Sequence, residues 1–126
     1  MKTGFNFESI PFSAKYYGTR IIDGWEHNAW TVKVHGKMFP FKVGMGRVDK
    51  RGNPLAPDTK TVMYCLLSYM RAGELPFEEF CSEFGYDEES RKAYALWEWC
   101  QNIAVKIESL FSPDEIEAME KALEDY

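Results

Sequence analysis

Histidine is scarce in this sequence. His27 and His35 are its only histidines, so a Ser/His or Cys/His catalytic pair has few candidates. The three cysteines, Cys65, Cys81 and Cys100, are odd in number and far apart, and each falls on the apolar side of an expected helix. This spacing favours buried thiols in a reducing compartment over a disulfide framework or a zinc site. The sequence therefore favours a non-enzymatic protein that has no cofactor and no metal.

Long hydrophobic runs are also missing. No apolar run approaches the roughly 20 residues needed to span a bilayer, and the opening "MKTGFNFESI" lacks the apolar region of a signal peptide. We expect a soluble, intracellular protein. A length of 126 residues predicts one domain, 1–126, that can bury a core without disulfide or metal staples.

The charged residues are unevenly distributed along the chain. Residues 1–63 contain ten Lys/Arg and five Asp/Glu, whereas residues 64–126 contain five Lys/Arg and fifteen Asp/Glu. The first half therefore favours anions and the second favours cations, or else the two halves attract each other.

Two short segments have the alternation of β-strands. Apolar and polar residues alternate in 30–34 and again in 38–43, on either side of a glycine-containing "HGK" turn. Together they predict a β-hairpin. Pro40 cannot donate to a strand ladder, so the second strand is expected at an edge or with a bulge. The preceding residues are expected to add one or two short strands, with "TRII" (19–22) as the best candidate.

Beyond Pro57 the pattern becomes helical. The central helix is expected to be buried over much of its circumference, and the last helix begins with a capping box, "SPDE". The expected limits are Asp58 to Gly73 for the first helix, Pro76 to Gly85 for the second, a cap at Asp87 for the third, and a cap at Ser112 for the fourth. The sequence predicts an α+β domain, with an N-terminal antiparallel hairpin or small sheet (1–57) packed on a C-terminal bundle of about four helices (58–126).

The stretch "KVGMGRVDKRGNP" (42–54) raises the question of a phosphate-binding loop. Gly44 and Gly46 follow an expected strand, but there is no third glycine at dinucleotide-binding spacing and no Gly-Lys-Ser/Thr. The next helix also begins too late for a phosphate to sit at its N-terminus. A bulge or turn is the better interpretation.

Basic residues around this loop suggest a nucleic-acid surface instead. They lie on or beside the hairpin, interleaved with aromatic residues that could stack on bases. However, the alternation places those aromatics on the face opposite the lysines of the strands. The candidate residues are Lys33, Lys37, Lys42, Arg47, Lys50 and Arg51.

Acidic residues gather in the helical half and suggest a surface for a basic protein partner. The candidates are Glu74, Glu78, Glu79, Glu83, Asp87, Glu88 and Glu89, with Trp99 as an aromatic anchor. The alternative is structural, because glutamate is a good helix former and helix N-termini favour acids. A tryptophan in such a position more often packs under a hairpin or a loop.

A third cluster, "DGWEHN", contains Asp23, Glu26 and His27. These side chains could bind a metal or work as acid and base. Asp and Asn beside glycine are also ordinary turn residues.

Two stretches, "DGWEHNAWTVKV" (23–34) and "LPFEEFCSEFGYDEESRKAYALWEWC" (75–100), resemble a group of small bacteriophage and prophage proteins. The shared features are a tryptophan-containing strand and a Phe-Gly-Tyr-Asp…Ser-Arg-Lys-Ala signature, here beginning at Phe84 and ending at Ala93. The resemblance carries over no catalytic residue. It implies a viral accessory protein in the cytoplasm of a bacterial host, of the kind that inhibits host defence (anti-CRISPR or anti-restriction type) by contact with a nuclease or CRISPR effector. Such an inhibitor is the leading hypothesis, and a nucleic-acid-binding accessory protein is the alternative.

Overall fold

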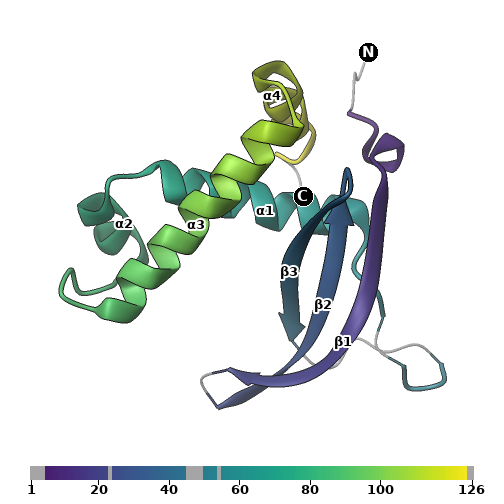
Figure 1. Cartoon of the computed structure of the whole chain (residues 1–126), viewed down its shortest axis with the longest axis horizontal. Helices are drawn as coiled ribbons and strands as arrows, with labels where there is room; N and C mark the ends of the chain where they lie inside the picture. Colours follow the sequence, from purple (N-terminus) through teal and green to yellow (C-terminus); the bar gives the residue numbers. More distant parts are fainter. Residues whose placement is uncertain (1–4, 23, 45–49, 54, 125–126) are drawn as a thin grey trace. The chain divides into compact units, whose positions relative to one another are not determined.

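The structure, a computed structural model, describes residues 5–22, 24–44, 50–53 and 55–124. The chain divides into two compact units, Asn6–Val62 and Met63–Tyr126, with Met1–Phe5 assigned to the second. The first unit contains a three-stranded sheet and the second contains most of the helical residues (Figure 1). The expected change from β-rich to helical portions, at 57/58, lies close to this division.

The predicted hairpin is confirmed. Strands β2 (Trp25–Val34) and β3 (Lys37–Gly44) pair antiparallel, with Val34 opposite Lys37. The two residues between them, His35 and Gly36, have φ values of 50° and 81°. Two successive positive φ values are typical of a type I′ turn, whose twist matches that of the flanking strands.

Strand β1 (Phe12–Ile22) completes the sheet in the order β1-β2-β3 and is longer than the sequence predicts. Its register with β2 shifts between Tyr16 and Gly18. This bulge divides the strand, so its side chains do not follow one continuous alternation from Phe12 to Ile22. Pro40 lies in β3, which is an edge strand, as expected.

In the part of the chain that the structure describes, four helices follow the sheet, and this confirms the α+β class. They are α1 (Thr59–Glu74), α2 (Phe77–Phe84), α3 (Arg91–Leu110) and α4 (Pro113–Ala122). A short 3₁₀ turn, Phe7–Ser9, precedes the sheet.

Three of the expected helix signals are present. The Asp58 carboxylate accepts from the backbone N–H of Thr61 at 2.8 Å, at the start of α1. Gly85 ends α2 in the left-handed conformation. The side chains and backbones of Ser112 and Glu115 form the reciprocal capping box of α4.

Two helix limits differ from the expectation. The cap of α3 is Ser90, whose hydroxyl accepts from the Ala93 N–H, and not Asp87. Gly73 does not end α1, which continues to Glu74. A Cβ at Gly73 would lie 2.5 Å from the carbonyl carbon of Cys100. This glycine therefore allows α1 and α3 to approach closely, a tertiary role that local sequence does not reveal.

The core of the helical unit contains a cluster of buried residues from all of its first three helices: Ala72, Phe80, Cys81, Ala93 and Cys100. Beside this cluster, aromatic rings of α2 and α3 pack against each other. The ring of Phe77 lies 5.3 Å from that of Trp97 and 5.3 Å from that of Tyr94. This packing fixes the orientation of α2, and with it the direction in which its charged side faces.

Candidate functional site

Helix α2 carries its charge on one side. Phe80 and Cys81 are buried in the core, whereas Glu78, Glu79 and Glu83 are exposed. At 100° per residue, these three glutamates lie on the half of the helix opposite its apolar stripe. Because α2 is fastened to α3 by its aromatic residues, the glutamates are held facing outward.

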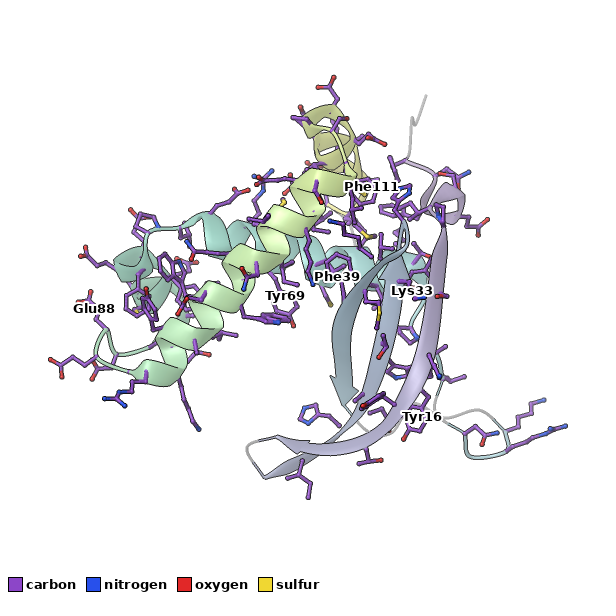
Figure 2. The ribbon with its side chains drawn as sticks, in the orientation of Figure 1. Tyr16, Lys33, Phe39, Tyr69, Glu88 and Phe111 are labelled. Carbon is purple, nitrogen blue, oxygen red and sulfur yellow. The ribbon has the colours of Figure 1, made fainter. Side chains whose placement is uncertain are left out.

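The loop from α2 to α3 extends this charge. Asp87, Glu88 and Glu89 are all exposed there, and Glu88 is labelled on this loop in Figure 2. The Asp87 carboxylate accepts from the Glu89 N–H at 2.9 Å, and the Asp87 carbonyl accepts from the Ser90 N–H at 3.0 Å. These bonds give the loop a defined turn. We call the six residues Glu78, Glu79, Glu83, Asp87, Glu88 and Glu89 the acidic surface.

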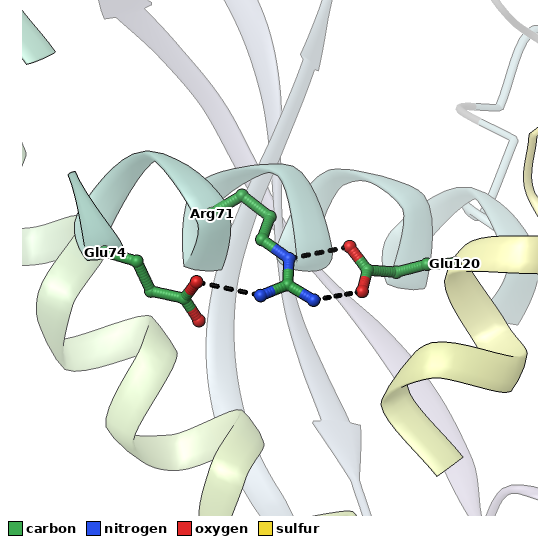
Figure 3. Close-up of polar contacts among 3 residues, drawn as sticks. All are labelled: Arg71, Glu74 and Glu120. Carbon is green, nitrogen blue, oxygen red and sulfur yellow. Dashed lines mark hydrogen bonds and ion pairs between the residues drawn. The ribbon is translucent and has the colours of Figure 1, made fainter. Parts of the chain in front are cut away.

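Glu74 has a different environment from the acidic surface. Its carboxylate lies 2.8 Å from Nη1 of Arg71, one turn earlier in α1 (Figure 3). The same guanidinium donates from Nε to Glu120 of α4 at 2.8 Å, and its Nη2 pairs with the other oxygen of that carboxylate. These hydrogen bonds, first to Glu120 and then to Glu74, raise the pKa of Arg71. Glu74 thus contributes to an ion-pair network within the helical unit.

Trp99, the expected aromatic anchor, is half-buried. Its ring meets that of Tyr69 edge to face, with centroids 4.8 Å apart, and it packs against the helical core cluster. Tyr69 is labelled in Figure 2. Desolvation, with smaller contributions from Cys65 and Cys100, raises the pKa of Tyr69. Trp99 therefore packs between α1 and α3. Its expected role as an anchor for a partner stays a prediction.

Most of the basic candidates are exposed on the sheet unit. Lys33 is exposed on β2 (labelled in Figure 2) and Lys37 at the start of β3. Lys50 and Arg51 are exposed in the turn that follows, while Arg47 lies outside the described residues. Lys42 lies in β3, where it is paired with Ala29.

The sheet also brings Lys15 into this region, a residue that sequence reasoning missed. In the register of β1 and β2, Ser13 is opposite Lys33 and Lys15 is opposite Thr31. Lys15 and Lys33 are therefore diagonal neighbours on one face. A prediction of β1 together with its register could have found this pair.

The aromatic residues of the sheet divide between its faces. Trp30 and Phe39 are buried on the face opposite Lys33, and so offer no stacking platform beside that lysine. Tyr17, two residues after Lys15 and within the bulge of β1, is 64% exposed. The burial of Trp30 and Phe39 agrees with the expected alternation, and among the described residues of β1 Tyr17 offers an exposed ring that could stack on bases.

The third cluster is only partly described. Asp23 lies outside the described residues, and His27 is half-buried in β2, opposite Arg20. Glu26 is paired with Ile21. Within 5–22, 24–44, 50–53 and 55–124, no group of three or more His, Cys, Asp or Glu could hold a metal ion.

The three cysteines are free thiols, and Cys81 and Cys100 are buried. Burial raises the pKa of the Cys100 thiol to about 11 and also raises that of Cys65. Desolvation, with smaller contributions from Glu88 and Asp87, raises the pKa of Cys81. Thiols with raised pKa values are protonated at neutral pH and are poor nucleophiles.

None of the helices in the described part of the chain is long and apolar enough to cross a membrane. Comparison of the sequence with models of known families and with curated proteins, and of the structure with solved structures, gave no match.

Proposed function

We propose that the protein acts non-enzymatically, by binding a basic region of a protein partner through its acidic surface. The observation that carries this proposal is the position of six exposed carboxylates on α2 and the following loop, within the twelve residues 78–89. The packing of α2 on α3 and the turn at Asp87 hold these carboxylates in place before any partner binds. A preformed charged surface accelerates association and selects for a partner of opposite charge.

The resemblance to phage accessory proteins suggests the kind of partner. Nucleases and CRISPR-type effectors hold nucleic acid in basic grooves, because phosphate neutralisation supplies most of their binding energy. An acidic surface that occupies such a groove inhibits by competition. We therefore propose a host nucleic-acid-handling protein as the partner, with anti-defence inhibition as the outcome.

The test is capture from a bacterial host lysate on the immobilised full chain. The variant E78K/E79K/E83K reverses three charges of the acidic surface. The matched control E98K/E108K/E117K reverses three exposed charges on α3 and α4, and so has the same net charge. The proposal predicts a protein that wild type and control retain, that the first variant loses, and that added single-stranded or duplex nucleic acid releases. Equal retention by the two triple variants contradicts it.

The fold of the first variant needs its own control. Lysines at 78 and 79 oppose the helix dipole, because both positions are in the first turn of α2. The neutral variant E78Q/E79Q/E83Q avoids this effect and is expected to lose part of the binding. Circular dichroism and thermal unfolding of all variants show whether a loss reflects unfolding.

A second candidate function rests on the pair Lys15 and Lys33. These lysines are exposed diagonal neighbours, and the exposed Tyr17 follows Lys15 by two residues in β1. They support the alternative of a nucleic-acid-binding accessory protein that uses its sheet. A mobility shift that weakens with salt and is lost in K15E/K33E supports this alternative. If no single- or double-stranded probe is shifted at low salt, the nucleic-acid-binding alternative is wrong.

A further inference from the structure

A groove of about 590 Å³ lies among α1, α2 and α4 of the helical unit. Its apolar lining includes Leu67, Leu75 and Leu123, which come from α1, from the turn after it and from the end of α4. The groove also has two aromatic residues, Tyr64 and Phe84, which are 42% and 51% exposed. Exposed aromatic rings beside an apolar hollow are typical of surfaces that bind another molecule.

Residues that line this groove also contact other residues of the helical unit. The ring of Phe84 lies 5.1 Å from that of the buried Phe80. Trp97 donates from its indole N–H to the carbonyl of Leu75 at 2.9 Å. Because these side chains are already ordered, a ligand would lose little free energy in fixing them.

The charges at the groove favour a cationic ligand. Arg71, Glu83 and Glu120 also line it. The guanidinium of Arg71 is offset by both Glu74 and Glu120, which leaves that network with one negative charge in excess. Glu83 belongs to the acidic surface, so the groove and that surface are continuous. Nucleic acid, anionic lipid and acidic peptides would be repelled, whereas a basic segment would be attracted.

The dimensions and pattern of the groove fit a helix. Its lining on the α1 side begins at Tyr64 and ends at Leu75, which spans about 16 Å at 1.5 Å per residue, or about three helical turns. The α1 positions within it follow helical spacing along one stripe. A guest helix that buries side chains at i, i+3, i+4 and i+7 meets such a stripe along its length.

We propose that this groove binds a basic amphipathic helix of the protein partner. The apolar side of the guest helix lies on Leu67, Leu75 and Phe84, and its basic side faces Glu83 and the rest of the acidic surface. This inference rests on the proposed function and adds to it the form of the segment that is recognised. Charge supplies attraction and rate, while the groove supplies the apolar contact area.

The groove can be blocked without changing its charge. Ser68 is exposed on α1 and lines the groove, and its hydroxyl donates to the carbonyl of Tyr64 in its own helix. The variant S68W fills the groove, and F84A removes one wall. The matched controls are V105W and I21A, which change an exposed residue of α3 and an exposed residue of β1, and neither residue lines the groove. Thermal unfolding confirms that each variant is folded.

The probe is a fluorescein-labelled peptide of about 14 residues, with leucine at helical i, i+3, i+4 and i+7 spacing and lysine elsewhere. Fluorescence anisotropy gives its Kd for each variant, and E78K/E79K/E83K is included. We expect S68W and F84A to bind about tenfold more weakly than wild type, V105W and I21A. We also expect weaker binding of a scrambled peptide and none of a peptide with glutamate in place of lysine.

The outcomes separate this inference from the proposed function. If S68W binds the peptide as wild type does while E78K/E79K/E83K does not, binding through the acidic surface is supported and the groove proposal is wrong. Failure of wild type to bind the peptide, or equal binding of the scrambled or glutamate peptide, also overturns it. A wild-type dimer in sedimentation velocity that S68W dissociates would instead place a second copy in the groove and overturn it too. Partner capture that is insensitive to E78K/E79K/E83K contradicts the proposed function itself.

Discussion

Gly73 of α1 lies directly against the backbone of Cys100 in α3. A Cβ on Gly73 would be 2.5 Å from the Cys100 carbonyl carbon and 2.6 Å from its oxygen. Real Cβ contacts are not this short, and the atoms concerned are main-chain atoms that cannot rotate away. The close crossing of α1 and α3, on which the helical core depends, therefore requires glycine at this position.

Replacement of Gly73 by alanine is expected to lower the free energy of unfolding. Alanine gains about 1 kcal/mol of helix propensity over glycine, but overpacking against a fixed backbone costs about 1–3 kcal/mol or more. Chemical denaturation measures the difference. Ser82→Ala, at an exposed position of α2, is the control and should be neutral or slightly stabilising. A G73A protein more stable than wild type would contradict the close approach.

The cap of α3 can be tested by comparing Ser90 with Asp87. Because the Ser90 hydroxyl accepts from the Ala93 N–H, Ser90→Ala is expected to cost about 1 kcal/mol of stability. Asp87→Ala removes only the loop bond to the Glu89 N–H and should cost less. Ser90→Asn retains an acceptor and should restore most of the loss. The opposite ranking of the two alanine variants would assign the cap to Asp87.

The pairing of Arg71 with Glu120 is expected to contribute modestly to stability. The Arg71 side chain is 52% exposed, and exposed ion pairs typically contribute about 0.2–1 kcal/mol. A double-mutant cycle with R71A and E120A should give a coupling energy in this range that decreases with added salt. A coupling energy of zero at low salt would show that the two side chains do not pair in solution.

Alkaline pH is expected to destabilise the fold through the buried thiols. Burial raises the pKa of Cys100 to about 11, so the folded state retains a proton that the unfolded state loses at lower pH. The stabilisation is complete below the unfolded pKa, near 9.0, and is lost as the pH rises toward 11. Denaturation between these pH values should show a smaller decline for Cys100→Ala than for wild type. An identical decline would mean that Cys100 does not contribute.

The parts of the fold that the sequence predicts are those controlled by local chemistry. Alternation of apolar residues predicts β2 and β3, and Asp58, Gly85 and Ser112 mark helix limits through bonds to residues close in sequence. Strand β1 is predicted only in part, at 19–22, and its bulge at Tyr16 and Gly18 divides the alternation along it. The expected helix end at Gly73 is wrong for another reason. The role of this glycine depends on Cys100, which lies 27 positions further along the chain.

In the candidate site, too, local patterns predict some features and tertiary contacts determine the others. The exposure of Glu78, Glu79 and Glu83 follows from their helical spacing opposite an apolar stripe. The engagement of Glu74 by Arg71 could have been suggested from their i, i+3 spacing, but the link from Arg71 to Glu120 crosses between helices. The groove requires α1, α2 and α4 together, so no local pattern predicts it.

The most direct test of the central claim is the fraction of a bacterial partner captured by E78K/E79K/E83K relative to E98K/E108K/E117K. Both variants have the same net charge, so only the position of the carboxylates differs. Binding through the acidic surface predicts that the first variant loses the partner while the second retains it as wild type does. Equal capture by the two variants would contradict a role for the acidic surface in binding.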